Sequence, residues 1–514
     1  MSSARLAGAL ALALAALGAC ADPAGDSADA PIEEVVEPLP LGDVQACDTP
    51  VPLGYTEVGE ALGLEGGPDP LATHHHGGSL AVADLDADGD RDIVLGWTQS
   101  PPRLWRNEGG RFFAEELPGP DGTFLFHLAD LDADGRLDLL VGGFKVDPQV
   151  LIQTDAGFVA WPLFDLPPQA RRARELSAGD LDGDGLLDVY AVTNAGSDSD
   201  TDRTDFVLRN EGDGLRYDPA AEVSVGRGFD AVWADADADG DPDVYVVNDV
   251  GADYGPNRLL LNDGGQLVAS EGCTCEIVHF GMGGDAADLN HDGLPDFFLT
   301  GVGVNALLES QADGTWVDTI RARAANSLQE SLHMGWGAVW LDHDNDGRLD
   351  ILVAQGDRWA QDDEASYDIV YDAPIDLLAG QPDGSFVQVG PALGLATSGS
   401  HRSAVADDLN GDGVLDLIVT DVVARPRVYL SDGCTDAGWL RVEAPPHTRV
   451  TWEHDGVSHT GWVTAESGYG ASHAPFLHIG LGSAPDVAAL RLDLPDGRIY
   501  AGTNVAGRRT LTIR

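Results

Sequence analysis

The sequence is poor in basic residues: its 514 residues include 29 Lys and Arg against 86 Asp and Glu, for a formal net charge of −57. Binding to nucleic acid needs clustered Lys and Arg to neutralise phosphates, so this balance argues against a nucleic-acid partner. The surplus of carboxylates suits metal cations or a strongly solvated acidic surface. Long hydrophobic runs are also scarce, because no segment after the first twenty residues is apolar enough to span a bilayer.

Common catalytic motifs are missing too. The chain has no nucleophile elbow, no H-E-x-x-H motif and no Gly-rich phosphate loop, which argues against several enzyme classes. Glycine and proline are plentiful instead, at 64 and 29 residues, and 43% of the chain is hydrophobic. Frequent turns with enough apolar material favour a folded all-β protein made of many short strands.

The N-terminus, "MSSARLAGALALALAALGAC", combines Arg5 with a short apolar run and small residues, as a signal peptide does. Its end, Leu17 to Cys20, resembles the bacterial lipobox, in which the cysteine is lipidated. By that resemblance, Ala21 favours the outer membrane or cell surface over inner-membrane retention. The alternative is an ordinary cleaved signal and a secreted protein. Residues 21–50 are acidic, rich in Ala and Pro and without periodicity, so we expect a disordered tether.

One acidic pattern, D-x-[DN]-x-D-G-x-x-D, occurs seven times. Such self-similarity along a chain marks a repeat architecture. The copies, numbered here as loops 1 to 7 in chain order, begin at Asp84, Asp130, Asp180, Asp235, Asp288, Asp342 and Asp408.

Calcium explains why these acids are placed so close together. Oxygens at positions 1, 3 and 5 of a tight turn can converge on one ion, Gly at position 6 permits the bend, position 7 offers its backbone carbonyl, and the acid at position 9 completes the set. The alternative is an Asp-Gly turn without an ion. The predicted ligands, for up to seven Ca²⁺, are Asp84, Asp86, Asp88, Asp90 and Asp92; Asp130, Asp132, Asp134, Arg136 and Asp138; Asp180, Asp182, Asp184, Leu186 and Asp188; Asp235, Asp237, Asp239, Asp241 and Asp243; Asp288, Asn290, Asp292, Leu294 and Asp296; Asp342, Asp344, Asp346, Arg348 and Asp350; and Asp408, Asn410, Asp412, Val414 and Asp416.

The flanks of the loops predict strands. Runs such as "SLAVAD" before a loop and "DIVLGW" after it are β-branched or aromatic, so each loop forms the tip of a strand–loop–strand hairpin. Two further strands follow most hairpins, which makes about four strands per repeat and predicts a seven-bladed β-propeller. The last repeat lacks its outer strand, and an unassigned strand lies at residues 54–64. We expect this N-terminal strand to complete the seventh blade and close the ring.

The cysteines fit this closure. Cys47 precedes the N-terminal strand and Cys434 follows its predicted neighbour, "RVYLSDG", so we expect a Cys47–Cys434 disulfide in an exported protein; two free thiols are the alternative. A bridge between Cys273 and Cys275 would span one residue, and the sequence leaves their state open.

The repeats resemble the FG-GAP/VCBS repeats of integrin-α-type propellers. The C-terminal region resembles the ASPIC/UnbV domain of the cartilage-acidic-protein family, through "GWLRVEAP", "SGYGASHAPFLHIGLG" and "NVAGRRTLTIR". The expected organisation is a signal peptide at 1–20, the tether at 21–50, the propeller at 51–433 and a small ASPIC/UnbV-like β domain at 434–514. The resemblance implies an extracellular, calcium-binding, non-catalytic adhesion or recognition protein.

Basic and His residues recur at the start of the innermost strands, six to nine residues before a loop. If all the loops lie on one face of the propeller, these residues surround the channel mouth on the other face, where they could bind an anion or a transition metal. Hydrogen-bonded strand ends without a shared role are the alternative. The candidate ligand mouth comprises His76, Arg174, Arg227, His279, His333 and His401.

Three functions are compatible with these features. The first is a calcium-stabilised surface propeller that binds a protein or polysaccharide without catalysis. The second is a propeller enzyme, a hydrolase or lyase that uses the His/Arg-rich mouth, because a fold alone does not exclude catalysis. The third is a passive envelope component. The sequence favours the first, since the carboxylates that look catalytic are assigned to calcium.

Overall fold

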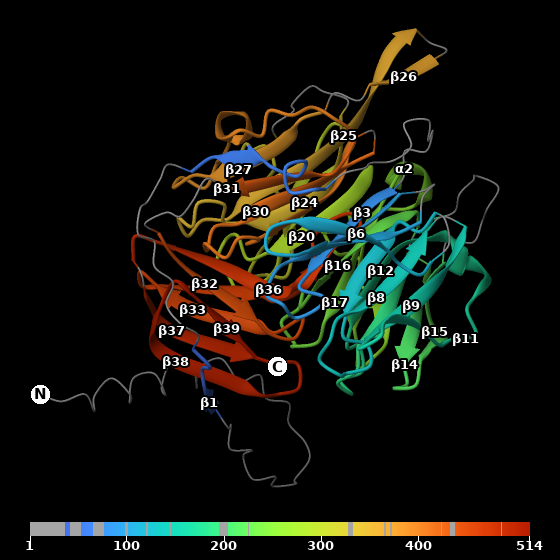
Figure 1. Cartoon of the computed structure of the whole chain (residues 1–514), viewed down its shortest axis with the longest axis horizontal. Helices are drawn as coiled ribbons and strands as arrows, with labels where there is room; N and C mark the ends of the chain where they lie inside the picture. Colours follow the sequence, from blue (N-terminus) through green and yellow to red (C-terminus); the bar gives the residue numbers. More distant parts are fainter. Residues whose placement is uncertain are drawn as a thin grey trace, which may run out of the picture. The chain divides into compact units, whose positions relative to one another are not determined.

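The computed structural model describes residues 36–41, 53–64, 77–97, 101–119, 122–143, 145–194, 204–224, 226–326, 333–363, 366–370, 373–422, 424–431, 437–484 and 486–513. All of these residues belong to one compact unit, Val36–Arg514. Their helical segments are short: η2 (Pro168–Arg172), α2 (Gly251–Tyr254) and η3 (Gly390–Leu393). The remaining elements are strands, which confirms the all-β class (Figure 1). No helix in this part of the chain has the length and apolar character needed to cross a membrane.

Most of the strands form seven antiparallel units of four strands. The first three units contain β3 (Gly77–Ala83), β4 (Asp92–Trp97), β5 (Arg103–Asn107) and β6 (Phe112–Glu116); β7 (Leu125–Ala129), β8 (Asp138–Gly143), β9 (Val146–Thr154) and β10 (Gly157–Trp161); and β12 (Ala173–Gly179), β13 (Asp188–Thr193), β14 (Thr204–Asn210) and β15 (Leu215–Ser224), with β11 (Leu163–Phe164) parallel to β15.

The next three units contain β16 (Gly228–Ala234), β17 (Asp243–Asn248), β18 (Arg258–Asn262) and β19 (Leu267–Ala269); β20 (Gly281–Ala287), β21 (Asp296–Gly301), β22 (Ala306–Ser310) and β23 (Trp316–Asp318); and β24 (His333–Leu341), β25 (Asp350–Asp363), β27 (Ile375–Gly380) and β28 (Phe386–Gln388), with β26 (Ser366–Val370) beside β25. The seventh unit contains β29 (His401–Asp407), β30 (Asp416–Asp421), β31 (Arg427–Ser431) and β2 (Tyr55–Glu57).

The N-terminal strand completes the seventh unit, as the sequence predicts. Strand β2 pairs antiparallel with β31, with Tyr55 opposite Ser431 and Glu57 opposite Tyr429. Glu57 also forms an ion pair with Arg425 at 2.7 Å. The pairing satisfies backbone groups that β31 would otherwise leave at an open sheet edge.

Hydrophobic clusters between successive units hold the ring together. One cluster joins Val94 and Leu104 of the first unit to Leu128 and Leu139 of the second, and the same arrangement repeats between every following pair of units. The last cluster packs Val405 and Ile418 of the seventh unit against Leu80 and Ile93 of the first. The innermost strands also contact one another in a cycle, with β29 against β3. The described strands therefore close a β-propeller, in which each unit is one blade.

The C-terminal region adds eight strands, which pack around a core containing Leu440, Val450, Leu490 and Leu511. These strands are β32 (Gly438–Glu443), β33 (Arg449–His454), β34 (Val457–Trp462), β35 (Thr464–Glu466), β36 (Ala471–Gly482), β37 (Asp486–Asp493), β38 (Ile499–Ala506) and β39 (Arg509–Thr512). Strands β34, β33, β37 and β38 form one sheet (Figure 1).

One part of the expected tether is ordered, which corrects the prediction for residues 21–50. Strand β1 (Val36–Pro38) pairs parallel with β38, and Leu41 bridges to Leu511. The strand is only three residues long, Val36–Pro38, which is too short to give a periodic signal in the sequence. The other residues of the predicted tether before residue 36 and after residue 41 lie outside the described ranges.

The C-terminal region also enters the propeller. Strand β36 pairs parallel with β3, so that Leu80 lies opposite Ala471 and Val82 opposite His473. The residues just before β36, Ser467–Gly470, are buried among the innermost strands. We call Ser467–Gly470 the plug. It connects the C-terminal sheet directly to the first blade.

Candidate metal centres

The aspartate at position 9 fastens each acidic loop to its blade. In loop 2, Asp138 accepts the backbone N–H of Leu131 at 2.9 Å through Oδ2 and that of Gln153 at 2.8 Å through Oδ1. The Oδ1 contact with the third strand occurs in all seven blades. Because a carboxylate offers about four lone-pair sites, these bonds leave acceptor capacity for a cation.

The loop backbone is the same in every copy. Gly at position 6 has a φ between 83° and 99°, the left-handed region where a side chain is strained. Position 4 also has positive φ in all seven loops, although it holds Ala, His or Asn in five of them. In loop 2, Oδ2 of Asp130 accepts the N–H of Gly135 at 2.9 Å. This turn folds the acids of positions 1, 3 and 5 toward one another.

The carboxylates converge as a metal site requires. In five of the loops, three side chains place one potential ligand atom each within 4.8 Å of the others. Loops 1, 3 and 4 do so with positions 1, 3 and 5, such as Asp84, Asp86 and Asp88, whereas loop 2 uses Asp130, Asp132 and Asp138. In loops 1 to 4 these potential ligand atoms are carboxylate oxygens, the hard ligands that Ca²⁺ prefers. In all seven copies, the predicted ligands lie in the loop that joins the first strand of the blade to the second, or at the first residue of that second strand.

Burial raises the pKa of the position 9 carboxyl in six of the loops, those of Asp92, Asp138, Asp188, Asp243, Asp296 and Asp416. Desolvation raises the pKa of Asp138 to about 7 and that of Asp416 to about 8, although backbone hydrogen bonds oppose the shift. The neighbouring carboxylates of the same loop contribute further to the increase. Mutual repulsion and burial therefore both disfavour the ionised state of these loops, and a bound divalent cation would relieve both.

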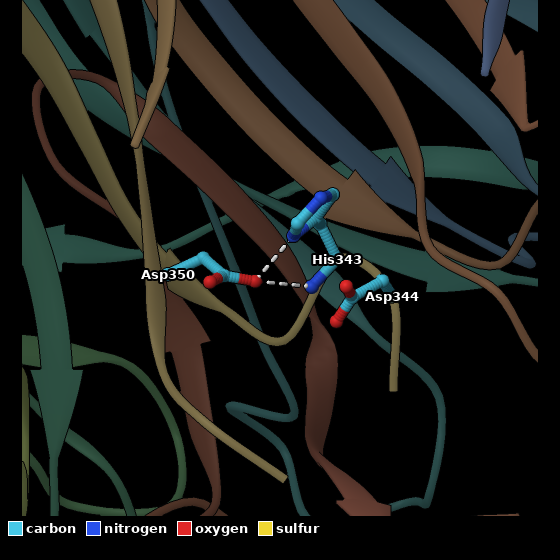
Figure 2. A group of neighbouring side chains, drawn as sticks. All are labelled: His343, Asp344 and Asp350. Carbon is cyan, nitrogen blue, oxygen red and sulfur yellow. Dashed lines mark hydrogen bonds and ion pairs between the residues drawn. The ribbon is translucent and has the colours of Figure 1, made fainter. Parts of the chain in front are cut away.

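Loop 6 differs from the others in its chemistry. His343, at position 2, contacts Oδ2 of Asp350 through Nδ1 at 2.5 Å and through its backbone N–H at 2.8 Å (Figure 2). Figure 2 shows Asp344 beside this pair, and the three residues form one of the candidate metal groups. Burial lowers the pKa of His343, but the hydrogen bond with Asp350 and its charge outweigh burial and raise it. The sequence analysis did not select His343.

The C-terminal region covers loops 6 and 7. Asn345 of loop 6 donates through Nδ2 to the carbonyl of Gly413 at 2.8 Å and contacts Nε2 of His478 at 2.7 Å through Oδ1. The N–H of Gly482 donates to the carbonyl of Asn345 at 2.7 Å. Trp439 packs so closely on loop 7 that a Cβ at Gly413 would lie 2.0 Å from its Nε1. Two of the candidate centres are thus held between the propeller and the C-terminal sheets.

The channel of the propeller contains buried acids. Glu175, Asp230 and Asp285 lie on successive innermost strands, and Glu466 comes from β35; we call these four the channel acids. Burial raises the pKa of Asp230 to about 8 and that of Asp285 to about 7. Burial and the charges of the other three raise the pKa of Glu466 well above its usual value.

The histidines that face the channel acids are neutral. Burial lowers the pKa of His127 to about 3 and that of His447 to about 4, and nearby histidines depress His127 further. Both residues line a small cavity together with Asp230 and Glu466. His127 Nδ1 lies 3.4 Å from Oε2 of Glu466.

The plug is fitted to this channel. Ser403 donates through Oγ to the carbonyl of Tyr469 at 2.7 Å, and Ser467 donates to the carbonyl of Ala404 at 3.0 Å. Tyr469 is fully buried and packs against Trp336, with ring centroids 4.9 Å apart. Glycines of the innermost strands make room, because a Cβ at Gly283 would lie 2.8 Å from the nitrogen of Tyr469. The plug is visible in the sequence as the motif "SGYG", but nothing in the motif indicates that it enters the centre of the propeller.

The candidate ligand mouth is placed at the strand starts, as its spacing indicates. Arg174, His333 and His401 lie within the first two residues of their strands. Arg227 lies one residue before its strand, and His279 lies two residues before its own. Burial lowers the pKa of Arg174, and the charge of Arg227 adds to this effect, so these two lie close together. His76 lies outside the described residues.

The mouth residues also have partners within the fold. Nε2 of His279 contacts the carbonyl of Val304 at 2.8 Å, and Nε of Arg227 donates to Oδ1 of Asn194 at 3.1 Å. His401 is completely buried. A shared role in ligand binding stays a prediction.

Two of the five cysteines lie within the described residues. Cys273 and Cys275, whose state the sequence left open, form a disulfide with their Cα atoms 5.1 Å apart. Cys20, Cys47 and Cys434 lie outside the described residues, so lipidation and the Cys47–Cys434 bridge stay predictions.

The fold and its acidic loops define a β-propeller whose repeats carry candidate metal-binding loops. A family model described as FG-GAP-like repeat matches five overlapping stretches, residues 84–141, 130–191, 180–246, 235–299 and 288–353, and a model described as ASPIC and UnbV matches residues 447–514. The chain therefore belongs to the FG-GAP-like repeat proteins and carries an ASPIC/UnbV region, as its resemblance predicts.

Human cartilage acidic protein 1 is similar to this chain, with 23% identity over 428 residues. The match covers 67% of this chain and 63% of the human protein, so the chain spans less than two thirds of its length. Among solved structures, YCF48 bound to D1 peptide is 9% identical, with a TM-score of 0.44 over 76% of this chain and 97% of that one. The extracellular domain of the hybrid two component system BT3049 from B. thetaiotaomicron is 12% identical, with a TM-score of 0.44 over 88% and 52%.

Proposed function

We propose that this chain is a calcium-binding recognition module that acts outside the cytoplasm and binds a protein or polysaccharide without catalysis. The observation that carries the proposal is the repeated loop: the same backbone turn occurs seven times around one ring, and in loops 1 to 4 it gathers three carboxylates within 4.8 Å of one another. Bound calcium would neutralise the repulsion between these acids. A rigid, stabilised ring then presents variable surface residues to a partner.

Two further features support an exported protein. The N-terminus has the pattern of a signal peptide, with a lipobox-like end that favours anchoring at the outer membrane or cell surface, and secretion as the alternative. The Cys273–Cys275 disulfide suits an oxidising compartment. The likeness to cartilage acidic protein 1 agrees with an extracellular role.

The way the acids are used supports the non-catalytic part of this proposal. The position 9 carboxylates hold backbone N–H groups of neighbouring strands, and the position 1 carboxylates hold the turn. A general acid or base must instead be within reach of a substrate. We therefore propose that these acids serve structure and metal binding.

Isothermal titration with calcium tests the proposal. The chain should bind several Ca²⁺, and changing Asp130, Asp132 and Asp134 of loop 2 to Asn should remove about one equivalent, because it removes the predicted oxygen charge of one site. The matched control is Asp213→Asn, an exposed aspartate outside the loops. In pull-down experiments, the chain should capture a surface protein or polysaccharide when calcium is present and lose it when calcium is removed. The absence of any calcium binding would contradict the proposal.

A further inference from the structure

A cavity of about 510 Å³ lies between the fifth and sixth blades and the C-terminal region. We call it the tail cavity. It is large enough for a small-molecule ligand, since such sites measure roughly 300–1,000 Å³. The residues that matter for its chemistry are Asp285 and Trp340 from the propeller and Trp452, Trp462, Glu466 and His478 from the C-terminal strands.

Several residues that line the cavity carry a buried polar atom without a hydrogen-bond partner. Among the described residues, Nε1 of Trp340, Nε1 of Trp462, Oε1 of Glu466 and Nδ1 of His478 are shielded from bulk water and have no hydrogen-bond partner. Each such group costs about 1–3 kcal/mol when it stays unpaired. Two of the four are obligate N–H donors, one is a carboxyl oxygen, and the imidazole nitrogen can take either role. A fitting ligand therefore needs hydrogen-bond acceptors as well as donors.

The aromatic side chains supply apolar contact surface. Trp452 is held in place by stacking on His459, with ring centroids 5.1 Å apart and an angle of 11° between the rings. Trp340 packs edge-on against Phe298, with centroids 6.0 Å apart. Rigid rings beside polar groups suit a ligand with an apolar face and a hydroxylated rim.

The charge of the wall limits the ligand further. Two guanidinium groups line the cavity, but both already have anionic partners. Arg323 is ion-paired with Glu309 and Arg348 with Asp346, so neither offers a free positive charge to an anion. An ammonium group would serve the carboxyl oxygen, but it has no lone pair for the indole N–H groups. Hydroxyl groups both donate and accept, so a hydroxylated ligand matches the mixed donor and acceptor residues of the wall.

We propose that the tail cavity binds a neutral oligosaccharide. The proposal rests on the proposed recognition function and specifies the ligand class and the site within it. The cavity is formed by the propeller and the ASPIC/UnbV region together, so neither part alone provides the site.

Binding of neutral trisaccharides tests this. Maltotriose, cellotriose and triacetylchitotriose are titrated into the full chain at saturating calcium, with tryptophan fluorescence and calorimetry as readouts. At least one should bind with a Kd of about 1 mM or below. Trp340→Phe and Trp462→Phe, which remove the indole N–H but keep a ring, should each weaken binding at least about fivefold. Trp161→Phe in β10, remote from the tail cavity, should have no effect.

Several outcomes would overturn the proposal: no trisaccharide binding at about 10 mM, unchanged affinity in both tryptophan variants, or equally tight binding of the anionic trigalacturonic acid. Calcium stoichiometry and the melting curve of each variant show whether it is folded, and Glu466→Gln provides an independent probe of the wall. If calcium binds and no sugar does, the sugar site fails and the proposed function stands. If sugar binds but calcium does not, the sugar site stands and the proposed calcium-binding function fails.

Discussion

Loops 2 and 6 have the same motif and the same turn, but they lie in different surroundings. In loop 2 the residues from Ala133 to Arg136 are exposed, and a Cβ at Gly135 would meet no atom within 4 Å. In loop 6, Asn345 is only 1% exposed and is bonded to both loop 7 and β36. The comparison shows that one repeated loop can face solvent in one blade and form part of a packed interface in another.

The largest expected effect is calcium removal, which separates the two kinds of loop. Each loaded site stabilises the fold by about 2.7 kcal/mol when free calcium is 100 times its Kd. EDTA should therefore lower the Tm by more than about 10 °C. Hydrogen exchange should then rise first in loops 1 to 4, because packing still holds loop 6. Equal loss of protection in all loops would erase the distinction.

Alanine at the position 6 glycines should show the same contrast. Gly413→Ala places a Cβ against Trp439 as well as straining the left-handed backbone, and should cost about 3–5 kcal/mol. Gly135→Ala strains the backbone alone and should cost about 1–2 kcal/mol. Urea unfolding at saturating calcium measures both. Equal losses would mean that the C-terminal cover does not constrain loop 7.

Asn345→Ala tests the covered loop directly. It removes the hydrogen bonds to Gly413 and His478 and should cost about 2–4 kcal/mol in urea unfolding. The reciprocal change at the same loop position, Ala133→Asn, meets only solvent and should change stability by less than about 0.5 kcal/mol. A similar result for both variants would contradict the contrast.

The pH dependence of folding stability should come from the channel acids rather than from exposed acids. Asp230 keeps its proton in the folded state up to a pKa of about 8, whereas the unfolded chain loses it near pH 4. Stability should therefore fall as pH rises between these values, by up to about 1.4 kcal/mol per pH unit. At saturating calcium, Asp230→Asn should flatten the decline measured by urea unfolding between pH 5 and 7. An unchanged slope would assign the effect to the other channel acids.

The sequence predicts the features that recur in each repeat as short local patterns. The loops, their flanking strands and the N-terminal strand that pairs with β31 all follow from patterns of fewer than twenty residues or from counting strands. The environment of each loop does not, because it depends on contacts between distant segments. Pairing of Leu80 with Ala471 uses backbone hydrogen bonds, which leave no side-chain pattern to read.

The same limit applies to the channel and the tail cavity. His401 stands at the predicted strand start, but its sequence position gives no indication that it is completely buried. Trp462 and Glu466 read as ordinary residues of a small β domain, and their meeting with Trp340 depends on how the C-terminal strands pack on the propeller.

The plug has a consequence for biosynthesis. Ser467–Gly470 follow every blade strand in the sequence, so they are the last part of the channel lining to be made. A chain that stalls before them would present a hydrated, acid-lined hole, a mark by which a cell's proteases could tell an unfinished molecule from a finished one.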